Sequence, residues 1–314
     1  MSKHLFGLVV TPHGTAANNR GENEGNITTL QKLLWKGDVH TTVSAEAIRW
    51  AIRYYWQRTG KLVNREWVED ANDHKWNDEK WLPWTDPAGK GKGKDTFIDD
   101  DVLGFMLAEA GKAEANDDEA EEGKGKKKQR VKGTCNARRG ALELTRAISL
   151  TPFTGDITFN AKSGEKGSTS LYGTEVHSTR YQYGFALTPQ WLRERLRALD
   201  VVDAVVSLSE VAGNQSRFLF DFSPDAVIFR WTDDFAPRLL YGFQIDSDGG
   251  LSVPEIMRRV NSGDIDPAEL VLGGAIADLE DGKGLKEKGA SVHSGVKAAA
   301  EEVKRRITTT LGAS

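Results

Sequence analysis

Residues 4–11 read His-Leu-Phe-Gly-Leu-Val-Val-Thr, an almost unbroken apolar run. Apolar and polar residues hardly alternate within it, so neither face of the corresponding strand is suited to contact with water. The run therefore predicts a central strand that is buried on both faces, to which the later strands of the chain are added.

The periodicities that follow predict the rest of the sheet and its helices. A helix over residues 45–57 has Ser44 at its N-cap position and an apolar stripe at helical spacing. A second helix is expected after Thr188, with Pro189 at its first position. Further strands are predicted over residues 141–150, 174–187, 218–222 and 226–231. The order strand, helix, strand, strand, helix, strand is that of the ferredoxin-like fold and predicts an α+β protein.

A long segment separates the strands predicted over residues 141–150 and 174–187. It is too long for a tight turn, and it contains the β-forming residues 157–159. We expect an extended hairpin that protrudes from the sheet, with Lys162 and Lys166 near its tip, where they could touch phosphate. A surface loop without fixed structure is the alternative.

Residues 61–137 interrupt the pattern and predict an insertion. A short helix is expected over residues 100–110, and an acidic and then a basic run extend over about 109–132. Such low-complexity tracts cannot bury enough surface to become ordered, so a disordered loop is expected there. The insertion also contains tryptophans that either form a small core, the reading we favour, or stack on bases: Trp67, Trp76, Trp81 and Trp84.

Composition excludes some classes of protein and bears on others. No apolar run approaches the roughly 20 residues of a membrane span. Cys135 is the only cysteine, so an intrachain disulfide is excluded and a cytoplasmic location is the simplest expectation. The net charge of −4 argues mildly against a nucleic-acid-binding protein, but acids concentrated over residues 109–122 leave the remaining surface less negative.

Amide and cationic side chains gather in a polar loop after the first strand and on the helix that follows. Such donors suit a phosphodiester backbone because they bind phosphate without requiring one particular base. A second patch precedes the strand predicted over residues 218–222, where Arg217 can form a forked contact with phosphate. The candidate nucleic-acid-binding residues are Asn18, Asn19, Arg20, Lys32, Lys36, Arg49 and Arg53 in the first patch, Asn214, Gln215 and Arg217 in the second, and Lys162 and Lys166 on the hairpin. Ordinary solvated surface is the alternative reading of each.

Motifs for catalysis are scarce. The sequence contains no P-loop, no G-x-S-x-G, no H-E-x-x-H and no C-x-x-C, and its six histidines lack metal-ligand spacing. The run Asp99–Asp101 could hold Mg²⁺, but adjacent carboxylates point apart, and a helix dipole favours acids at this end. His177 could act as a base, although a packed histidine is the simpler reading. We therefore predict no catalytic residue, metal site or cofactor.

Five blocks of the sequence, in the order in which they occur, resemble the Cas-seven family, which comprises the backbone subunits of type I CRISPR surveillance complexes (Cascade). The resemblance is strongest to the DevR-like autoregulator branch of that family. The blocks include the polar loop leading into the T-V-S-A-E-A-I-R-W helix, the S-L-T-P strand end and the A-G-N-Q-S-R loop. The blocks lie between residues 4 and 245, at residues 18–56, 97–106, 147–152, 175–185 and 212–219.

The resemblance implies a non-catalytic subunit that polymerises along a crRNA guide and presents it for pairing with target DNA. It also implies an RRM-like (ferredoxin-like) palm of residues 1–60 and 138–314, a thumb hairpin of about 153–174 and a finger insertion of 61–137. The implied partners are crRNA, target DNA, neighbouring copies of the chain and other Cascade subunits, with no membrane. The alternatives are a metal-dependent ribonuclease on the same fold and a regulatory or scaffold protein that binds no RNA.

Overall fold

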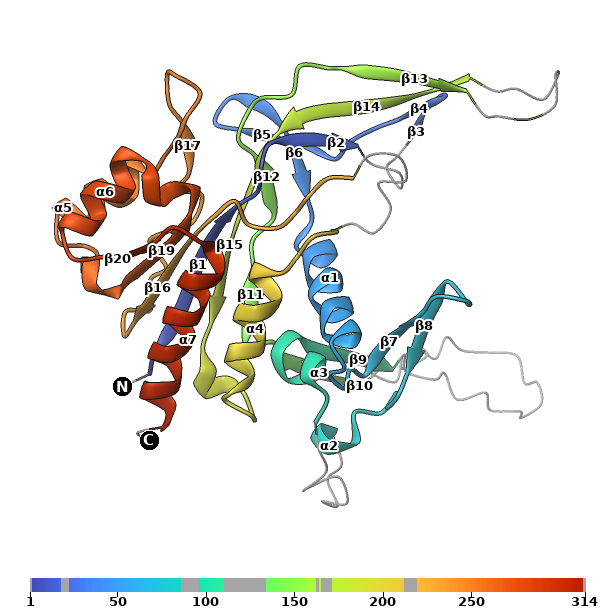
Figure 1. Ribbon diagram of the computed structural model, residues 1–314. Helices are drawn as coiled ribbons and strands as arrows, with labels where there is room; N and C mark the ends of the chain where they lie inside the picture. Colours follow the sequence, from blue (N-terminus) through green and yellow to red (C-terminus); the bar gives the residue numbers. More distant parts are fainter. Residues whose placement is uncertain are drawn as a thin grey trace, which may run out of the picture. The chain divides into compact units, whose positions relative to one another are not determined.

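The computed structural model describes residues 2–17, 23–85, 96–109, 134–161, 164, 171–211 and 219–312 (Figure 1). As predicted, the fold is mixed α+β. The chain forms two compact units, one of Met1–Leu62 with Ala141–Ser314 and one of Val63–Gly140. Among the described residues, no helix is long and apolar enough to cross a membrane.

The first unit is built on a nine-stranded sheet with β1 near its middle. Every residue of β1 is buried, and β1 pairs antiparallel with β15 on one side and β16 on the other, which confirms the predicted central strand. In spatial order the strands are β20 (Ser291–His293), β19 (Leu270–Gly274), β16 (Ala226–Thr232), β1 (His4–Val10), β15 (Tyr181–Leu187), β12 (Ala147–Ser149), β6 (Asp38–Val43) and β5 (Lys32–Trp35), with β11 (Leu142–Leu144) also paired to β15.

Packed layers cover both faces of this sheet. One face carries α1 (Ala45–Arg58), α4 (Arg197–Val206) and α7 (Val296–Gly312), which lie on the same side in Figure 1. On this face the Phe185 ring crosses Gly7 so closely that a Cβ there would lie 2.0 Å from it. The other face packs Phe6, Leu8 and Val10 beneath α5 (Pro254–Asn261) and α6 (Glu280–Glu287).

Helix α1 follows its sequence closely. The Ser44 hydroxyl accepts a hydrogen bond from the Ala47 backbone N–H, as its N-cap position predicts. The buried face of the helix consists of Ile48, Ala51, Ile52 and Trp56. Local capping and helical periodicity therefore suffice to place this helix and orient its apolar face.

A smaller sheet extends from the same unit. The strand β14 (Leu171–Thr179) pairs antiparallel with β13 (Ile157–Ala161), within the segment for which a hairpin was predicted, and Figure 1 shows this pair projecting beyond the large sheet. The other strands of this smaller sheet are β2 (Gly14–Ala17), β3 (Asn23–Glu24) and β4 (Ile27–Thr28).

The single strand predicted over residues 174–187 is wrong. The chain turns at Arg180, so that β14 and β15 belong to different sheets. The Arg180 guanidinium donates to the Thr11 carbonyl and to the Asp225 carboxylate. Because these partners are far away in sequence, the periodicity of the segment could not reveal the turn.

Three other predicted strands and helices differ from the structure. The strand over residues 141–150 is split into β11 and β12, because Thr145 leaves the ladder and its hydroxyl accepts from the Gly184 backbone N–H. The helix predicted after Thr188 also differs. The Thr188 hydroxyl is hydrogen-bonded to His4 Nδ1 instead of capping a helix, a short 3₁₀ turn follows, and α4 begins only at Arg197.

The third difference lies between residues 219 and 222, where no strand forms. Phe220 and Phe222 are buried there, but the Phe222 backbone N–H donates to the Ser209 carbonyl, outside any ladder. The strand predicted over residues 226–231 is confirmed as β16. The remaining short elements of the first unit are β17 (Gln244–Ile245), β18 (Leu251–Ser252) and the 3₁₀ turns Pro189–Trp191, Pro267–Glu269 and Ala275–Asp278.

The second unit has a small aromatic core. Trp81 is 6% exposed, stacks on Phe105 at 4.8 Å between ring centroids and meets the edge of Trp76 at 5.2 Å. The predicted helix over residues 100–110 is wrong beyond Leu103, because Gly104 adopts a φ of 72° and starts a strand. The elements are β7 (Arg65–Val68), β8 (Asp73–Trp76), α2 (Leu82–Thr85), α3 (Ile98–Leu103), β9 (Gly104–Glu109) and β10 (Thr134–Arg139).

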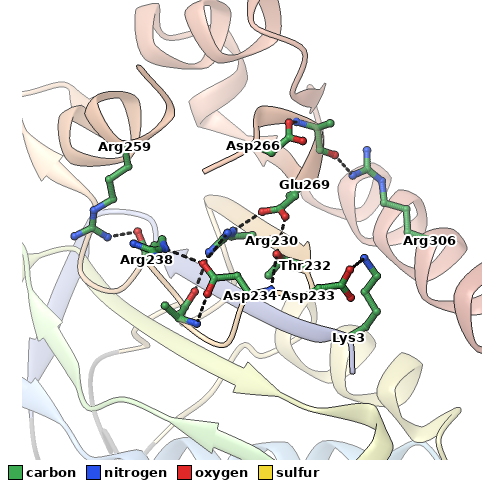
Figure 2. Close-up of polar contacts among 12 residues, drawn as sticks. Lys3, Arg230, Thr232, Asp233, Asp234, Arg238, Arg259, Asp266, Glu269 and Arg306 are labelled. Atoms are coloured by element: carbon green, nitrogen blue, oxygen red, sulfur yellow. Dashed lines mark hydrogen bonds and ion pairs between the residues drawn. The ribbon is translucent and has the colours of Figure 1, made fainter. Parts of the chain in front are cut away.

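A buried arginine anchors the loop that follows β16 (Figure 2). Arg230 is 2% exposed; its Nε donates to Glu269 Oε2 at 2.7 Å, and its Nη2 donates to Asp234 Oδ2 at 3.2 Å. The Thr232 hydroxyl donates to the other oxygen of Glu269 at 2.6 Å. Together these contacts secure the start of the loop whose Leu239 packs against the second face of the sheet.

Two tyrosines on β15 should respond differently to loss of their hydroxyl groups. Tyr181 Oη and Thr41 Oγ1 are hydrogen-bonded at 2.7 Å, whereas Tyr183 Oη is buried without a partner among the described residues. Tyr181→Phe should lower the free energy of unfolding by about 1–2 kcal/mol, because the buried Thr41 hydroxyl loses a partner. Tyr183→Phe should be neutral or stabilising. Urea unfolding of both variants tests this, and equal losses would contradict it.

Candidate nucleic-acid interface

The face of α1 that points away from the core is rich in arginine and aromatic side chains. At 3.6 residues per turn, Arg49, Arg53 and Gln57 form one row beside the buried stripe. Trp50, Tyr54 and Arg58 form a second row, in which Trp50 lies opposite Ile48 and Ile52. Glu46, in the first turn, is the only acid of the helix. We call these two rows together the outer face of α1. The sequence analysis did not recognise the second row, although its residues follow each other at the helical spacing i, i+4, i+8.

Arg49 lies in a partly buried setting beside a second arginine. Burial lowers the pKa of Arg49, the neighbouring Arg53 guanidinium lowers this pKa further, and Glu46 opposes the effect. Two like charges one helical turn apart repel each other. A phosphate group within reach of both guanidinium groups would accept charge-assisted hydrogen bonds from them.

The second row is an ordered stack. The Trp50 and Tyr54 rings are nearly parallel, at an interplanar angle of 13° and 5.2 Å between centroids. The Arg58 guanidinium lies 5.9 Å from the centroid of the Tyr54 ring. The second row is therefore a stacked pair of aromatic rings followed by a guanidinium group, and it runs beside the row that contains Arg49 and Arg53.

The two lysines of the first predicted patch lie in different settings. Lys32 Nζ is 2.7 Å from the Glu175 carboxylate and 5.0 Å from the centroid of the Phe153 ring. Glu175 also accepts from the Leu30 backbone N–H at 2.7 Å, so these contacts tie the start of β5 to β14. Lys36 is exposed in the turn between β5 and β6, with a φ of 52°.

The other candidate residues lie outside the described residues: Asn18, Asn19, Arg20, Lys162, Lys166, Asn214, Gln215 and Arg217. Their described flanks gather around β14. Ala17 pairs with Val176 before residues 18–22, and Ile27 pairs with Gly173 after them. A Cβ on Gly14 would lie 3.3 Å from Phe220, which follows residues 212–218. The flanks of all three predicted patches therefore meet at the smaller sheet.

The large sheet does not offer an open face to a nucleic acid. RRM domains stack bases on aromatic side chains of an exposed sheet face. Here the corresponding side chains, such as Phe6 and Leu8, are buried beneath α5 and α6. Helices, loops and the hairpin are therefore the surfaces through which a nucleic acid can be bound.

His177 serves the packing of this unit. It is 3% exposed, and its Nδ1 and Nε2 atoms lie 2.7 and 3.3 Å from the hydroxyl groups of Thr41 and Thr151. Burial is the largest effect on its pKa and lowers it, which favours the neutral imidazole. A packed histidine accounts for each of these contacts.

The three aspartates of α3 have protein partners. Asp99 accepts from the backbone N–H groups of Asn64 and Arg65, at 2.7 and 3.1 Å. Asp100 accepts from Trp81 Nε1 at 2.8 Å, and Asp101 from Arg138 Nη2 at 2.8 Å. Within the described ranges, no group of three or more His, Cys, Asp or Glu side chains is arranged to hold a metal ion.

The known proteins that this chain resembles are associated with CRISPR systems. No family model matches it. The CRISPR-associated protein Cas7/Cst2/DevR of Myxococcus xanthus (strain DK1622) is 47% identical over an alignment of 320 residues, which covers 98% of each protein.

Chains of two solved structures share the fold. The first, from a pre-nicking CRISPR RNA-guided surveillance complex, has a TM-score of 0.54 at 12% identity and covers 98% of this chain and 100% of that one. The second, from a CRISPR RNA-guided surveillance complex, has a TM-score of 0.53 at 13% identity and covers 96% and 99%. The resemblance of the sequence motifs is therefore confirmed, and the chain belongs to the Cas7/Cst2/DevR family of CRISPR-associated proteins.

Proposed function

We propose that this protein is a non-catalytic backbone subunit of a type I CRISPR effector, which polymerises along crRNA and leaves the guide bases available to target DNA. The observation that carries the proposal is the outer face of α1, where Arg49 and Arg53 lie one helical turn apart, outside the buried stripe of the helix. A subunit repeated along a variable guide cannot read its sequence, so contacts to phosphate and 2′-hydroxyl groups should dominate.

The same proposal assigns roles to the parts of the fold. The strand order β16-β1-β15-β12, with β1 antiparallel to β15 and β16, supports a ferredoxin-like palm. In that fold the helices follow the first and third strands, as α1 and α4 do here. The hairpin β13–β14 would be the thumb and the compact unit Val63–Gly140 the finger. Neighbouring copies and other subunits of the effector are the partners this role requires.

The proposal is tested on protein purified at moderate salt. We expect co-purifying RNA, seen as a raised ratio of absorbance at 260 to 280 nm, and a large regular assembly by size-exclusion chromatography when guide RNA is added. Binding should weaken steeply with salt, because each phosphate contact releases counterions. A monomer that ignores guide RNA at low salt would reject the proposal and favour a scaffold protein.

A further inference from the structure

The hairpin β13–β14 is held at its base by two side chains of β14. Glu175 is the last residue of β14 that pairs with β13, and from Val176 onward the strand pairs with β2 instead. Glu175 and His177 lie on one face of the strand, because side chains alternate along it. The two side chains therefore occupy the point from which the hairpin projects.

Both side chains contact the same place on the large sheet. The Glu175 carboxylate lies 2.7 Å from Lys32 Nζ, and His177 Nδ1 lies 2.7 Å from Thr41 Oγ1. Lys32 and Thr41 are direct partners in the ladder between β5 and β6, so the two contacts are side by side. The Phe153 ring contacts both, with its centroid 5.0 Å from Lys32 Nζ and 5.5 Å from the centroid of the His177 ring.

The two contacts differ in burial. His177 is 3% exposed, whereas the side chains of Lys32 and Glu175 are 29% and 12% exposed. The buried contact keeps the base of the hairpin attached, and the partly exposed ion pair can open into water while that contact remains. Ion pairs near the surface contribute little to overall stability. Restricting how two attached elements are oriented is a role that such a pair can fill.

The direction of the hairpin decides where its exposed apolar side chains lie. Phe159 of β13 and Leu171 of β14 are on the same face as Glu175, further from the base, and both are exposed. A rotation at the base would move them together. An element that must reach a neighbouring copy binds better when its direction is already fixed, because less conformational freedom is lost on binding.

We propose that the Lys32–Glu175 pair is a latch that fixes the direction of the hairpin, with His177 as the pivot beside it. Lys32 then acts on RNA binding as a positioning residue and makes no contact with phosphate. This inference rests on the proposed function, in which the hairpin is the thumb. The effect of the latch on RNA affinity is limited to the preference that it gives to one direction of the hairpin.

The distance between two nitroxide labels measures the direction of the hairpin without RNA. The labels are attached at Ala161→Cys on β13 and Thr308→Cys on α7, two exposed positions, after the native cysteine is removed by Cys135→Ser. Pulsed electron–electron resonance should give a narrow distance distribution for this labelled parent protein.

Four variants of the labelled protein test the latch. Lys32→Gln and Glu175→Gln each remove one charge of the pair and should broaden or shift the distance distribution. Exchanging the charges, by Lys32→Glu with Glu175→Lys, should largely restore it. Arg258→Gln is the matched control, because it breaks an exposed ion pair on α5 and should leave the distribution unchanged.

RNA binding separates a latch from a phosphate contact by the sign of the effect. Glu175→Gln removes a negative charge, so charge alone would raise the affinity for guide RNA, whereas loss of the latch should lower it. We expect Lys32→Gln and Glu175→Gln each to lower the affinity about threefold to fivefold, the range open to a partly exposed ion pair. The slope of log affinity against log salt concentration should stay at its wild-type value.

The remaining outcomes reject the latch or the proposed function separately. If Lys32→Gln lowers the salt slope by about 0.7 and Glu175→Gln raises the affinity, Lys32 binds phosphate; the latch is rejected and the proposed function stands. Unchanged distance distributions in both single variants also reject the latch. If the wild-type protein ignores guide RNA at low salt, the proposed function fails and the positioning role of Lys32 fails with it, while the label distances still decide whether the pair directs the hairpin.

Discussion

Replacing Glu269 with alanine is expected to lower the free energy of unfolding by about 3 kcal/mol. The substitution leaves the Arg230 guanidinium, 2% exposed, without its shortest carboxylate contact and removes the acceptor of the Thr232 hydroxyl. Breaking a buried ion pair from one side costs about 3–5 kcal/mol, because a charge remains in a region of low dielectric constant. We expect the lower end of this range, since Glu269 is 26% exposed and since Asp234 and the Ala236 carbonyl still accept from Arg230.

Urea unfolding followed by circular dichroism measures this loss. Glu255→Ala is the matched control. It also removes a glutamate from an ion pair with arginine, but in that pair the side chains of Glu255 and Arg258 are both at least half exposed. Such exposed pairs contribute only about 0.2–1 kcal/mol, so the control should lie close to the wild type. Removing both charges, as in Arg230→Met with Glu269→Gln, should recover part of the stability. Equal losses for Glu269→Ala and Glu255→Ala would show that the buried pair has no special role.

Replacing Arg49 and Arg53 together with glutamine is expected to weaken guide-RNA binding about hundredfold near 0.15 M salt. Hydrogen bonds to charged groups contribute about 1.5–3 kcal/mol each, and two such contacts to phosphate would be lost. Glutamine keeps most of the length and helix propensity of arginine, so the fold should be retained. The slope of log affinity against log salt concentration should also fall by about 1.4, or about 0.7 for each phosphate contact to a single strand.

A salt titration of RNA binding, by fluorescence anisotropy, gives the affinity and the slope in one experiment. Arg258→Gln is the matched control, because it removes one exposed arginine from α5, on the other face of the sheet. It should leave the slope nearly unchanged. If the double variant lowers affinity without changing the slope, Arg49 and Arg53 support the fold of the site and do not bind phosphate.

The two variants also separate stability from binding. Glu269→Ala acts on the loop after β16. That loop packs, together with α5 and α6, against one face of the large sheet. Arg49 and Arg53 lie on α1, which covers the opposite face. A protein that loses stability through Glu269→Ala but retains RNA affinity while folded would show that the covered sheet face has only a structural role.

Candidate site residues could be recognised from the sequence when their signal was local. The helical period separated Arg49 and Arg53 from the buried stripe of α1, and it also contained the Trp50–Tyr54 spacing that was overlooked. The setting of Lys32 could not be read in this way. Its partner Glu175 is 143 residues away, and only the pairing of distant strands brings the two side chains together.

The sequence by itself determined β1, α1 and the α+β class, because an apolar run, an N-cap and a helical period act within a few residues of one another. The tertiary structure alone decided where β14 ends and β15 begins, since the turn at Arg180 depends on Thr11 and Asp225. It also decided that both faces of the large sheet are covered, which leaves α1, the loops and the hairpin as the surfaces for the proposed RNA binding. Local preferences cannot report such features, because their free energy comes from contacts between residues that meet only when the whole chain has folded.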